Sequence, residues 1–207
     1  MDPVLLMGVA LGLRHGTAPD HLAAIDGLTR LRPNRANGVF FALGHGLTVI
    51  LLAVGIGHVI AGHFSAVGPW TLIVIGTLNL WRMIRGRTNR VVIARPIVLQ
   101  PFLLGVMLAA GFETASQLSA LLLAGSSNAW LLGLAFSAGM VLVDGMDGVL
   151  AASTQRLAAA GGGNAAAASK MLGILVIIFS FGLGGGQLLG IPIDRFALPL
   201  GTRSSSP

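Results

Sequence analysis

The sequence has 207 residues, of which 54% are hydrophobic and only 10% are charged. Soluble domains carry about 25% charged residues, so this composition, with a mean hydropathy of +0.84, excludes an ordinary soluble globular domain. The formal net charge is +6, but the basic residues lie between apolar stretches, which argues against a nucleic-acid-binding protein. We therefore expect an all-α integral membrane protein that is surrounded by the lipid bilayer.

Six stretches, taken in chain order, are predicted to form transmembrane helices. Residues 36–81, 114–143 and 171–193 contain no Asp, Glu, Lys or Arg, and about 20 apolar residues suffice to cross a bilayer. The first residues lack the basic region of a cleavable signal peptide, so the first helix is expected to remain. The whole chain, 1–207, is predicted to be a single membrane domain with spans at 3–28, 38–61, 69–85, 97–124, 129–152 and 171–191 and a tail at 192–207.

The distribution of basic residues predicts the orientation of the chain in the cell membrane. Residues 29–37, 82–96 and 153–170 hold ten of the 13 Lys and Arg residues, whereas 62–68 and 125–128 hold none. Because cytoplasmic loops are enriched in Lys and Arg, we expect the three basic loops in the cytoplasm and both termini outside. The Ala- and Gly-rich run inside the third basic loop is predicted to be a flexible loop.

The first predicted span holds several ionisable side chains, which are costly in the bilayer core and usually mark a functional site. Two of them, His15 and His21, would lie about 240° apart around an unbroken helix that turns about 100° per residue. They could not then share one ligand. The ionisable residues of this span are Arg14, His15, Asp20, His21 and Asp26.

The residues between the two histidines favour a break in this helix. Gly16 loosens the backbone, and Pro19 removes a backbone donor and disfavours helical geometry at the residue before it. We therefore predict that the first helix is broken near residues 16–19, which lets the two histidines and Asp20 converge. In the alternative, the proline only kinks the helix and Asp20 pairs with Arg14.

The second, fourth and fifth predicted spans carry further polar side chains. His45 lies between two glycines that let another helix approach closely, although a lone histidine there could simply bond a carbonyl group. Glu113 and Gln117 are four residues apart, and Asp144 and Asp147 are three apart, so each pair shares one helical face. In the alternative, Glu113 or Asp144 neutralises the arginine of the first span.

The chain shows signs of an internal repeat. A shift of 97 positions aligns residues 8–18 with 105–115, and a shift of 95 aligns 38–47 with 133–142, with several glycines and a phenylalanine matched. Three spans per unit would insert the two halves with opposite topology, an arrangement common among transporters that bind substrate near the bilayer midplane. The two predicted inverted three-helix repeats are residues 3–85 and 97–191.

The chemistry of the polar side chains points to a transition metal. The chain contains no cysteine, so any metal must be held by nitrogen and oxygen. Imidazole nitrogens with a few carboxylate oxygens suit Ni²⁺, Co²⁺ and Zn²⁺ better than Ca²⁺ or Mg²⁺, which prefer ligand sets made of oxygen. The sequence therefore predicts a permease for a divalent transition-metal ion.

Four short segments occur in an order that resembles one known family. They are RHGTAPDHLAAID, FFALGHG, GFETASQ and GMVLVDGMDG, and they resemble the H-x4-D-H, glycine-histidine, G-F-D-T-A-T-E and G-M-x-x-x-D-T-x-D-G motifs of the nickel/cobalt transporters (NiCoT). The resemblance covers roughly residues 8–152 and implies a short, six-helix secondary transporter whose signature helix comes first. The family has an acidic residue where this chain has Ala18, Asp at the position of Glu113, and Glu at that of Gln117.

The combined hypothesis is a secondary transporter that carries Ni²⁺ or Co²⁺ into the cell as its substrate, with no cofactor and no enzymatic activity. Two alternatives stay open: an exporter of metal ions or small solutes on the same scaffold, and an intramembrane metalloenzyme. The absence of an H-E-x-x-H motif makes the metalloenzyme less favourable. The predicted metal ligands are His15, Asp20, His21, His45, Glu113, Asp144 and Asp147, with Arg14, Thr114 and Gln117 in supporting positions.

Overall fold

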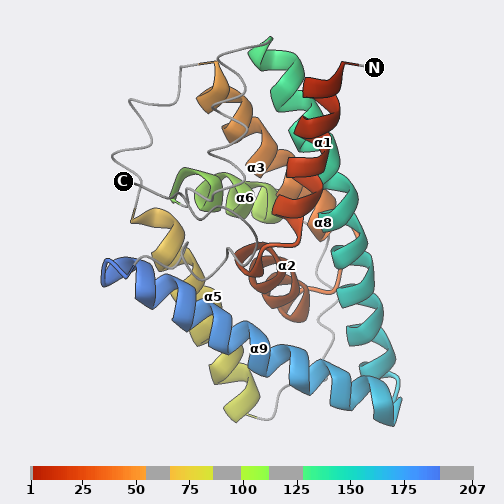
Figure 1. Ribbon diagram of the computed structural model, residues 1–207. Coiled ribbons are helices and arrows are strands. Elements are labelled where there is room, and N and C mark those ends of the chain that lie inside the picture. The colour runs from red at the N-terminus through yellow and green to blue at the C-terminus, as the bar shows by residue number, and fades with distance from the viewer. Residues whose placement is uncertain (1, 55–65, 86–98, 112–127, 192–207) are drawn as a thin grey trace, which may run out of the picture.

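The structure is a computed structural model that describes residues 2–54, 66–85, 99–111 and 128–191. All regular secondary structure within these ranges is helical, as the sequence predicts (Figure 1). The helices are α1 (Pro3–Gly16), α2 (Pro19–Leu31), α3 (Asn37–Ala53), α5 (Val67–Ile84), α6 (Leu99–Gly111), α8 (Ala129–Ala159) and α9 (Gly163–Leu188).

Three of these helices, α5, α8 and α9, are long and apolar enough to cross a membrane. Helices α1, α3 and α6 are apolar but shorter. On α8, the side chains of Leu142, Met146 and Leu150 follow one another at four-residue spacing and are 61–67% exposed. A continuous apolar stripe on an outer helix face is what contact with lipid requires. The chain thus has the character of an all-α, multi-pass membrane protein.

The predicted break in the first span is confirmed. Helix α1 ends at Gly16 and α2 begins at Pro19, and the two segments run in different directions (Figure 1). Ala18, which precedes the proline, has an extended backbone with φ −66° and ψ 143°, as expected for a residue whose helical geometry a following proline ring obstructs. The amide of Ala18 still donates to the carbonyl of His15 at 2.9 Å, so the chain turns directly after the first histidine.

The prediction of a flexible loop within residues 153–170 is wrong. Helix α8 continues to Ala159 and α9 begins at Gly163, so the connection consists of residues 160–162 alone. Alanine has the highest helix propensity of all residues, and the alanine runs on both sides of the glycines extend the two helices. Gly161, with a φ of 87°, makes the turn in a conformation that favours glycine.

Two pairs of helices cross with their backbones in contact. Helix α1 lies along α8 (Figure 1), and a Cβ atom on Gly12 would collide with the carbonyl oxygen of Phe136. Helix α3 crosses α6 in the same manner, where a Cβ atom on Gly44 would collide with the carbonyl of Phe102. Such glycines let helices approach closely in membranes, where packing rather than hydrophobicity holds them together. These crossings fix the backbones that carry His15 and His45.

Candidate metal site

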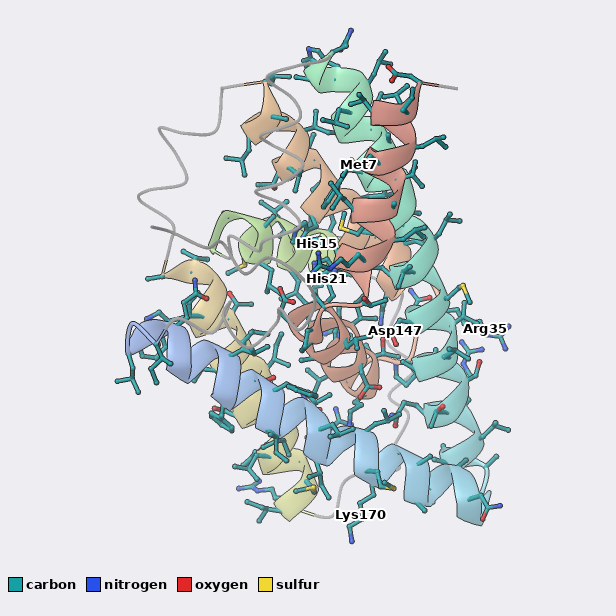
Figure 2. All side chains as sticks on the ribbon, viewed as in Figure 1. Met7, His15, His21, Arg35, Asp147 and Lys170 are labelled. Atoms are coloured by element: carbon teal, nitrogen blue, oxygen red, sulfur yellow. The ribbon has the colours of Figure 1, made fainter. Side chains whose placement is uncertain are left out.

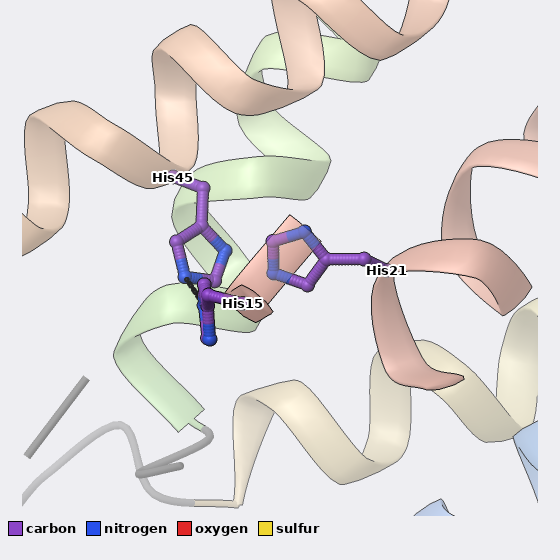
Figure 3. Close-up of side chains that lie close together, drawn as sticks. All are labelled: His15, His21 and His45. Carbon is purple, nitrogen blue, oxygen red and sulfur yellow. Dashed lines mark hydrogen bonds between the residues drawn. The ribbon is translucent and has the colours of Figure 1, made fainter. Parts of the chain in front are cut away.

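Three histidines from three different helices converge in the interior of the protein (Figures 2 and 3). His15 lies in the last turn of α1, His21 in the first turn of α2, and His45 near the middle of α3. Their ring centroids are 4.5–4.9 Å apart, and one ligand atom from each lies within 4.8 Å of the others. All three are at most 1% exposed. The helix break is what brings the first two together, because it turns the chain between them.

His21 is held by a carboxylate on its inner side. Its Nδ1 lies 3.1 and 3.2 Å from the two side-chain oxygens of Asp144 on α8, and both side chains are fully buried. With Nδ1–H donating to Asp144, the opposite nitrogen, Nε2, carries the free lone pair. Within the described residues, this Nε2 is buried and has no hydrogen-bond partner. The bond to Asp144 therefore fixes the ring and leaves the Nε2 of His21 as one oriented nitrogen ligand.

His15 and His45 face each other through their Nε2 atoms, which are 3.0 Å apart (Figure 3). One of these nitrogens must carry a proton and donate it to the other. The Nδ1 atom of His45 is buried without a hydrogen-bond partner among the described residues. An ion that replaced the proton between the two rings would bind to both nitrogens, since coordination needs the unprotonated form.

Two phenylalanines enclose the imidazole group. Phe41 of α3 stands edge-on to the ring of His21, with centroids 4.9 Å apart, and Phe136 of α8 lies 5.2 Å from the ring of His15. Both are fully buried. They restrict the rotamers of the histidines and keep the site apolar, which strengthens any electrostatic attraction to a cation. Their role was not predicted from the sequence, although the shift of 95 residues matches the two phenylalanines as a pair.

The other predicted residues lie around this group rather than in it. Asp20 is 4% exposed, and its Oδ2 has no hydrogen-bond partner within the described residues. Asp147 lies one turn beyond Asp144 on α8, at the level of α2 (Figure 2). Arg14 is exposed, and in the part of the chain described, it lies beyond 4.0 Å from Asp20. The alternative of an ion pair between these two is therefore wrong.

Part of the predicted site falls outside the described residues. This holds for Glu113, Thr114 and Gln117, which follow directly after α6. Asp26 on α2 was noted as ionisable but not included among the predicted ligands. It is 5% exposed, and neither of its carboxylate oxygens has a partner among the described residues.

The arrangement favours capture of a cation over covalent chemistry. It offers up to three neutral imidazole nitrogens in a dry environment, backed by carboxylates that balance positive charge. Unpartnered buried nitrogens are unfavourable unless something binds them, and a metal ion of intermediate softness would satisfy them. Met140, a possible sulfur ligand, is instead fully buried in an apolar cluster with Ala42, Val49 and Phe136.

Comparison with known proteins connects this arrangement to a group of transporters. The profile of the NicO family, described as a high-affinity nickel-transport protein, matches residues 4–95. This range includes all three clustered histidines. No solved structure matches the chain significantly.

Curated relatives are similar over most of the chain. It is 30% identical to the hydrogenase nickel incorporation protein HupN of Bradyrhizobium diazoefficiens, over 93% of this chain and 65% of HupN. It is 28% identical to the nickel transporter NixA of Staphylococcus aureus, over 93% of this chain and 74% of NixA. Over an alignment of 54 positions, which covers 24% of this chain and 15% of the relative, it is 46% identical to the cobalt transport protein NhlF of Rhodococcus rhodochrous. The chain spans slightly less than two thirds of HupN, and the family profile and these relatives make it similar to nickel and cobalt transporters.

Proposed function

We propose that this protein carries a divalent transition-metal ion, Ni²⁺ or Co²⁺, across the cell membrane through the site formed by His15, His21 and His45. The observation that carries the proposal is the convergence of three buried imidazoles whose candidate ligand atoms lie within 4.8 Å of one another. Relatives named for nickel and cobalt transport support the choice of ion. Because the matching family profile and the relatives describe transporters, we set aside the metalloenzyme alternative.

Selection among divalent ions follows from the type of ligand. Imidazole nitrogen binds Ni²⁺ and Co²⁺ well, whereas Mg²⁺ and Ca²⁺ prefer oxygen and would have to give up water for nitrogen. Asp20, which precedes His21 in the chain, and Asp147, one turn after Asp144 on α8, are proposed to supply oxygen ligands or charge compensation. The role of Glu113 as a ligand stays a prediction. The dry surroundings of the histidines favour an ion that sheds part of its water shell as it binds.

We assign Asp144 the role of positioning His21. Both of its oxygens lie within hydrogen-bond distance of the imidazole Nδ1, and carboxylates in this arrangement fix the ring and raise the basicity of the other nitrogen. The seven ligands predicted from the sequence are thereby divided into nitrogens that contact the ion and at least one carboxylate that acts through a histidine.

Replacing Asp144 by asparagine is expected to weaken Ni²⁺ binding by about 10–100-fold, the usual effect of losing a carboxylate behind a metal-bound histidine. The amide keeps one oxygen acceptor but loses the negative charge. Titration calorimetry on the purified protein would measure the change, with Asp2→Asn as the control because Asp2 is exposed and caps α1. Unchanged affinity in Asp144→Asn would contradict the positioning role.

Matched contacts support the inverted repeat. A Cβ atom on Gly12 of α1 would meet the carbonyl of Phe136 on α8, and one on Gly105 of α6 would meet the carbonyl of Phe41 on α3. If α1 corresponds to α6 and α3 corresponds to α8, each of these two contacts is the equivalent of the other. We therefore retain two inverted three-helix halves as the proposed architecture.

The reciprocal contacts follow the same pairing. Gly139 faces the carbonyl of Val9, as Gly44 faces that of Phe102. The contacts favour a shift of 93 residues between the first and fourth predicted helices, since Gly12 then corresponds to Gly105. The shift of 95 between α3 and α8 is unchanged, since it pairs Gly44 with Gly139.

We propose the orientation with both termini outside and the basic connections in the cytoplasm. Inward movement of a divalent cation across about 100 mV releases roughly 4.6 kcal/mol, twice the value for a single charge. The membrane potential can therefore drive uptake. The third basic connection is shorter than predicted, but Arg156 and Lys170 still lie near the ends of α8 and α9. The proposed orientation is therefore unchanged.

The direct test is metal accumulation. Cells that express the chain are expected to accumulate radiolabelled Ni²⁺ and Co²⁺ faster than cells with an empty vector, and excess Mg²⁺ should not compete. Collapse of the membrane potential should slow this uptake. Lower cellular nickel on expression would support the exporter alternative instead, and accumulation equal to that of the vector control would contradict the proposed transport.

A further inference from the structure

A second polar pocket lies between α2, α5, α8 and α9, away from the three histidines. Its cavity volume is about 10 Å³, which is room for one water-sized group. The pocket is therefore too small for an organic molecule to enter but large enough for a single oxygen atom of a larger ligand. Its lining residues are Arg30, Asn79, Arg82, Met83, Gln155 and Gly173.

The lining of this pocket is rich in hydrogen-bond donors and contains no carboxylate. Within the described ranges, the guanidinium groups of Arg30 and Arg82 lie beyond 4.0 Å from any Asp or Glu oxygen. Gln155 is only 7% exposed, and its Oε1 accepts a bond of 3.0 Å from the hydroxyl of Ser169. Its Nε2 is left buried with no partner among these residues. Asp26, one turn before Arg30 on α2, attracts its guanidinium from outside the pocket lining without forming an ion pair. A set of donors whose lining holds no acidic group is suited to an anion.

Both arginines are held in place rather than extended into solvent. Arg30 donates to the carbonyl and the hydroxyl of Ser169, and its guanidinium lies against Gly173, where a Cβ atom would come within 2.5 Å of Nη2. Arg82 donates to the carbonyl of Leu31 at 3.4 Å. Their remaining N–H groups stay available for a ligand, since each guanidinium has five.

The surroundings place the pocket at the level of lipid headgroups. Trp81, next to Arg82, is 46% exposed, and the guanidinium of Arg85 lies 4.4 Å from its ring. Tryptophan and arginine at the end of a membrane helix are typical of the boundary between water and lipid. The neighbouring Leu78 and Ile84 are 41% and 75% exposed, so the same helix end offers apolar surface for acyl chains.

We propose that this pocket binds the phosphate group of an anionic membrane lipid. The phosphate lies at the mouth and accepts hydrogen bonds from Arg30 and Arg82, while one of its oxygens reaches the Nε2 of Gln155. Basic pockets between membrane helices recognise anionic headgroups in this way. The proposal does not depend on metal transport, because none of its residues belongs to the histidine site.

Thermal unfolding of the full chain in neutral detergent tests the proposal. Added phosphatidylglycerol is expected to raise the Tm by about 2–4 °C, the shift that a stabilisation of modest size produces in a chain of this length. Phosphatidylcholine and inorganic phosphate at the same concentration are expected to leave the Tm unchanged. An equal effect of inorganic phosphate would overturn the assignment to a lipid, and an equal effect of phosphatidylcholine would overturn the assignment to an anion.

Two pairs of variants connect the effect to the pocket. Gly173→Ala displaces the flexible end of Arg30 without changing the charge, whereas Gly182→Ala on the same helix meets nothing within 4 Å. Arg82→Gln removes a charge from the pocket, and Arg156→Gln removes one from an exposed position on α8. We expect the phosphatidylglycerol shift to be lost in the first member of each pair and kept in the second. A full shift in both Gly173→Ala and Arg82→Gln would overturn the proposal.

Discussion

Replacing His21 by alanine is expected to reduce Ni²⁺ affinity by more than about 100-fold, the upper end of the effect of losing a residue that only supports a ligand. The change removes a nitrogen whose direction Asp144 fixes, and it leaves two imidazoles that contact each other at 3.0 Å. The two remaining imidazoles come from α1 and α3 alone, so the ion loses its ligand from α2. Calorimetry on the purified chain measures the affinity, and uptake of labelled Ni²⁺ by cells should fall to the vector level.

The controls for this variant separate binding from folding. His21→Ala alone leaves a buried carboxylate unpaired, which costs about 3–5 kcal/mol. The double variant His21→Ala/Asp144→Ala removes both partners and avoids this cost. Leu22→Ala alters the adjacent position, which is 38% exposed, and should keep wild-type affinity. Nickel binding of wild-type strength in a folded double variant would exclude His21 as a ligand.

Replacing Gly12 by alanine is expected to destabilise the whole helical assembly. The added Cβ atom collides with the backbone carbonyl of Phe136, which cannot rotate away, so α1 and α8 must separate. Overpacking of this kind costs about 1–3 kcal/mol, and sometimes more. It should also disturb metal binding, since Phe136 lies against the ring of His15.

A second glycine on the same helix supplies the control. A Cβ atom on Gly8 meets the end of the Leu132 side chain at 2.7 Å, and such a side chain can adopt another rotamer. Gly8→Ala should therefore lower the Tm by less than Gly12→Ala. Thermal unfolding in detergent compares the two, and equal Tm values would show that the backbone contact between α1 and α8 contributes little.

Local features of the sequence predicted the main chain near the site. The break between α1 and α2 depends on Gly16 and Pro19, whose conformational preferences act over one or two residues. The side-chain partners could not be predicted in the same way. His21 and Asp144 are separated by 123 positions in the chain, so their contact depends on how α2 packs against α8. Conversely, the glycines near residue 161 suggested a flexible loop, whereas the alanines on both sides of them extend α8 and α9.

The proposed internal repeat shows a further limit of sequence comparison. Shifts of 97 and 93 residues differ by four positions, which is about one helical turn. Both alignments therefore match residues on one face of α1 to residues on one face of α6. Identities among glycine, alanine and leucine do not distinguish the two alignments. Contacts such as Gly105 with the carbonyl of Phe41 favour the shorter shift.

The glycine crossings have a consequence for the proposed transport. Helices α1, α3, α6 and α8 touch through their main chains, and a Cβ atom on Gly38 of α3 would likewise collide with the carbonyl of Asp144. These four elements form an inflexible frame that resists sliding. Helix α2 follows α1 through the short link of Thr17 and Ala18, and side chains hold it to its other neighbours, through the bond of His21 to Asp144 and that of Arg30 to Ser169. Its Gly27 likewise meets side chains rather than backbone. In the proposed transport, pivoting of α2 would break the bond between His21 and Asp144, draw one imidazole from the other two and release the ion while the frame stays intact.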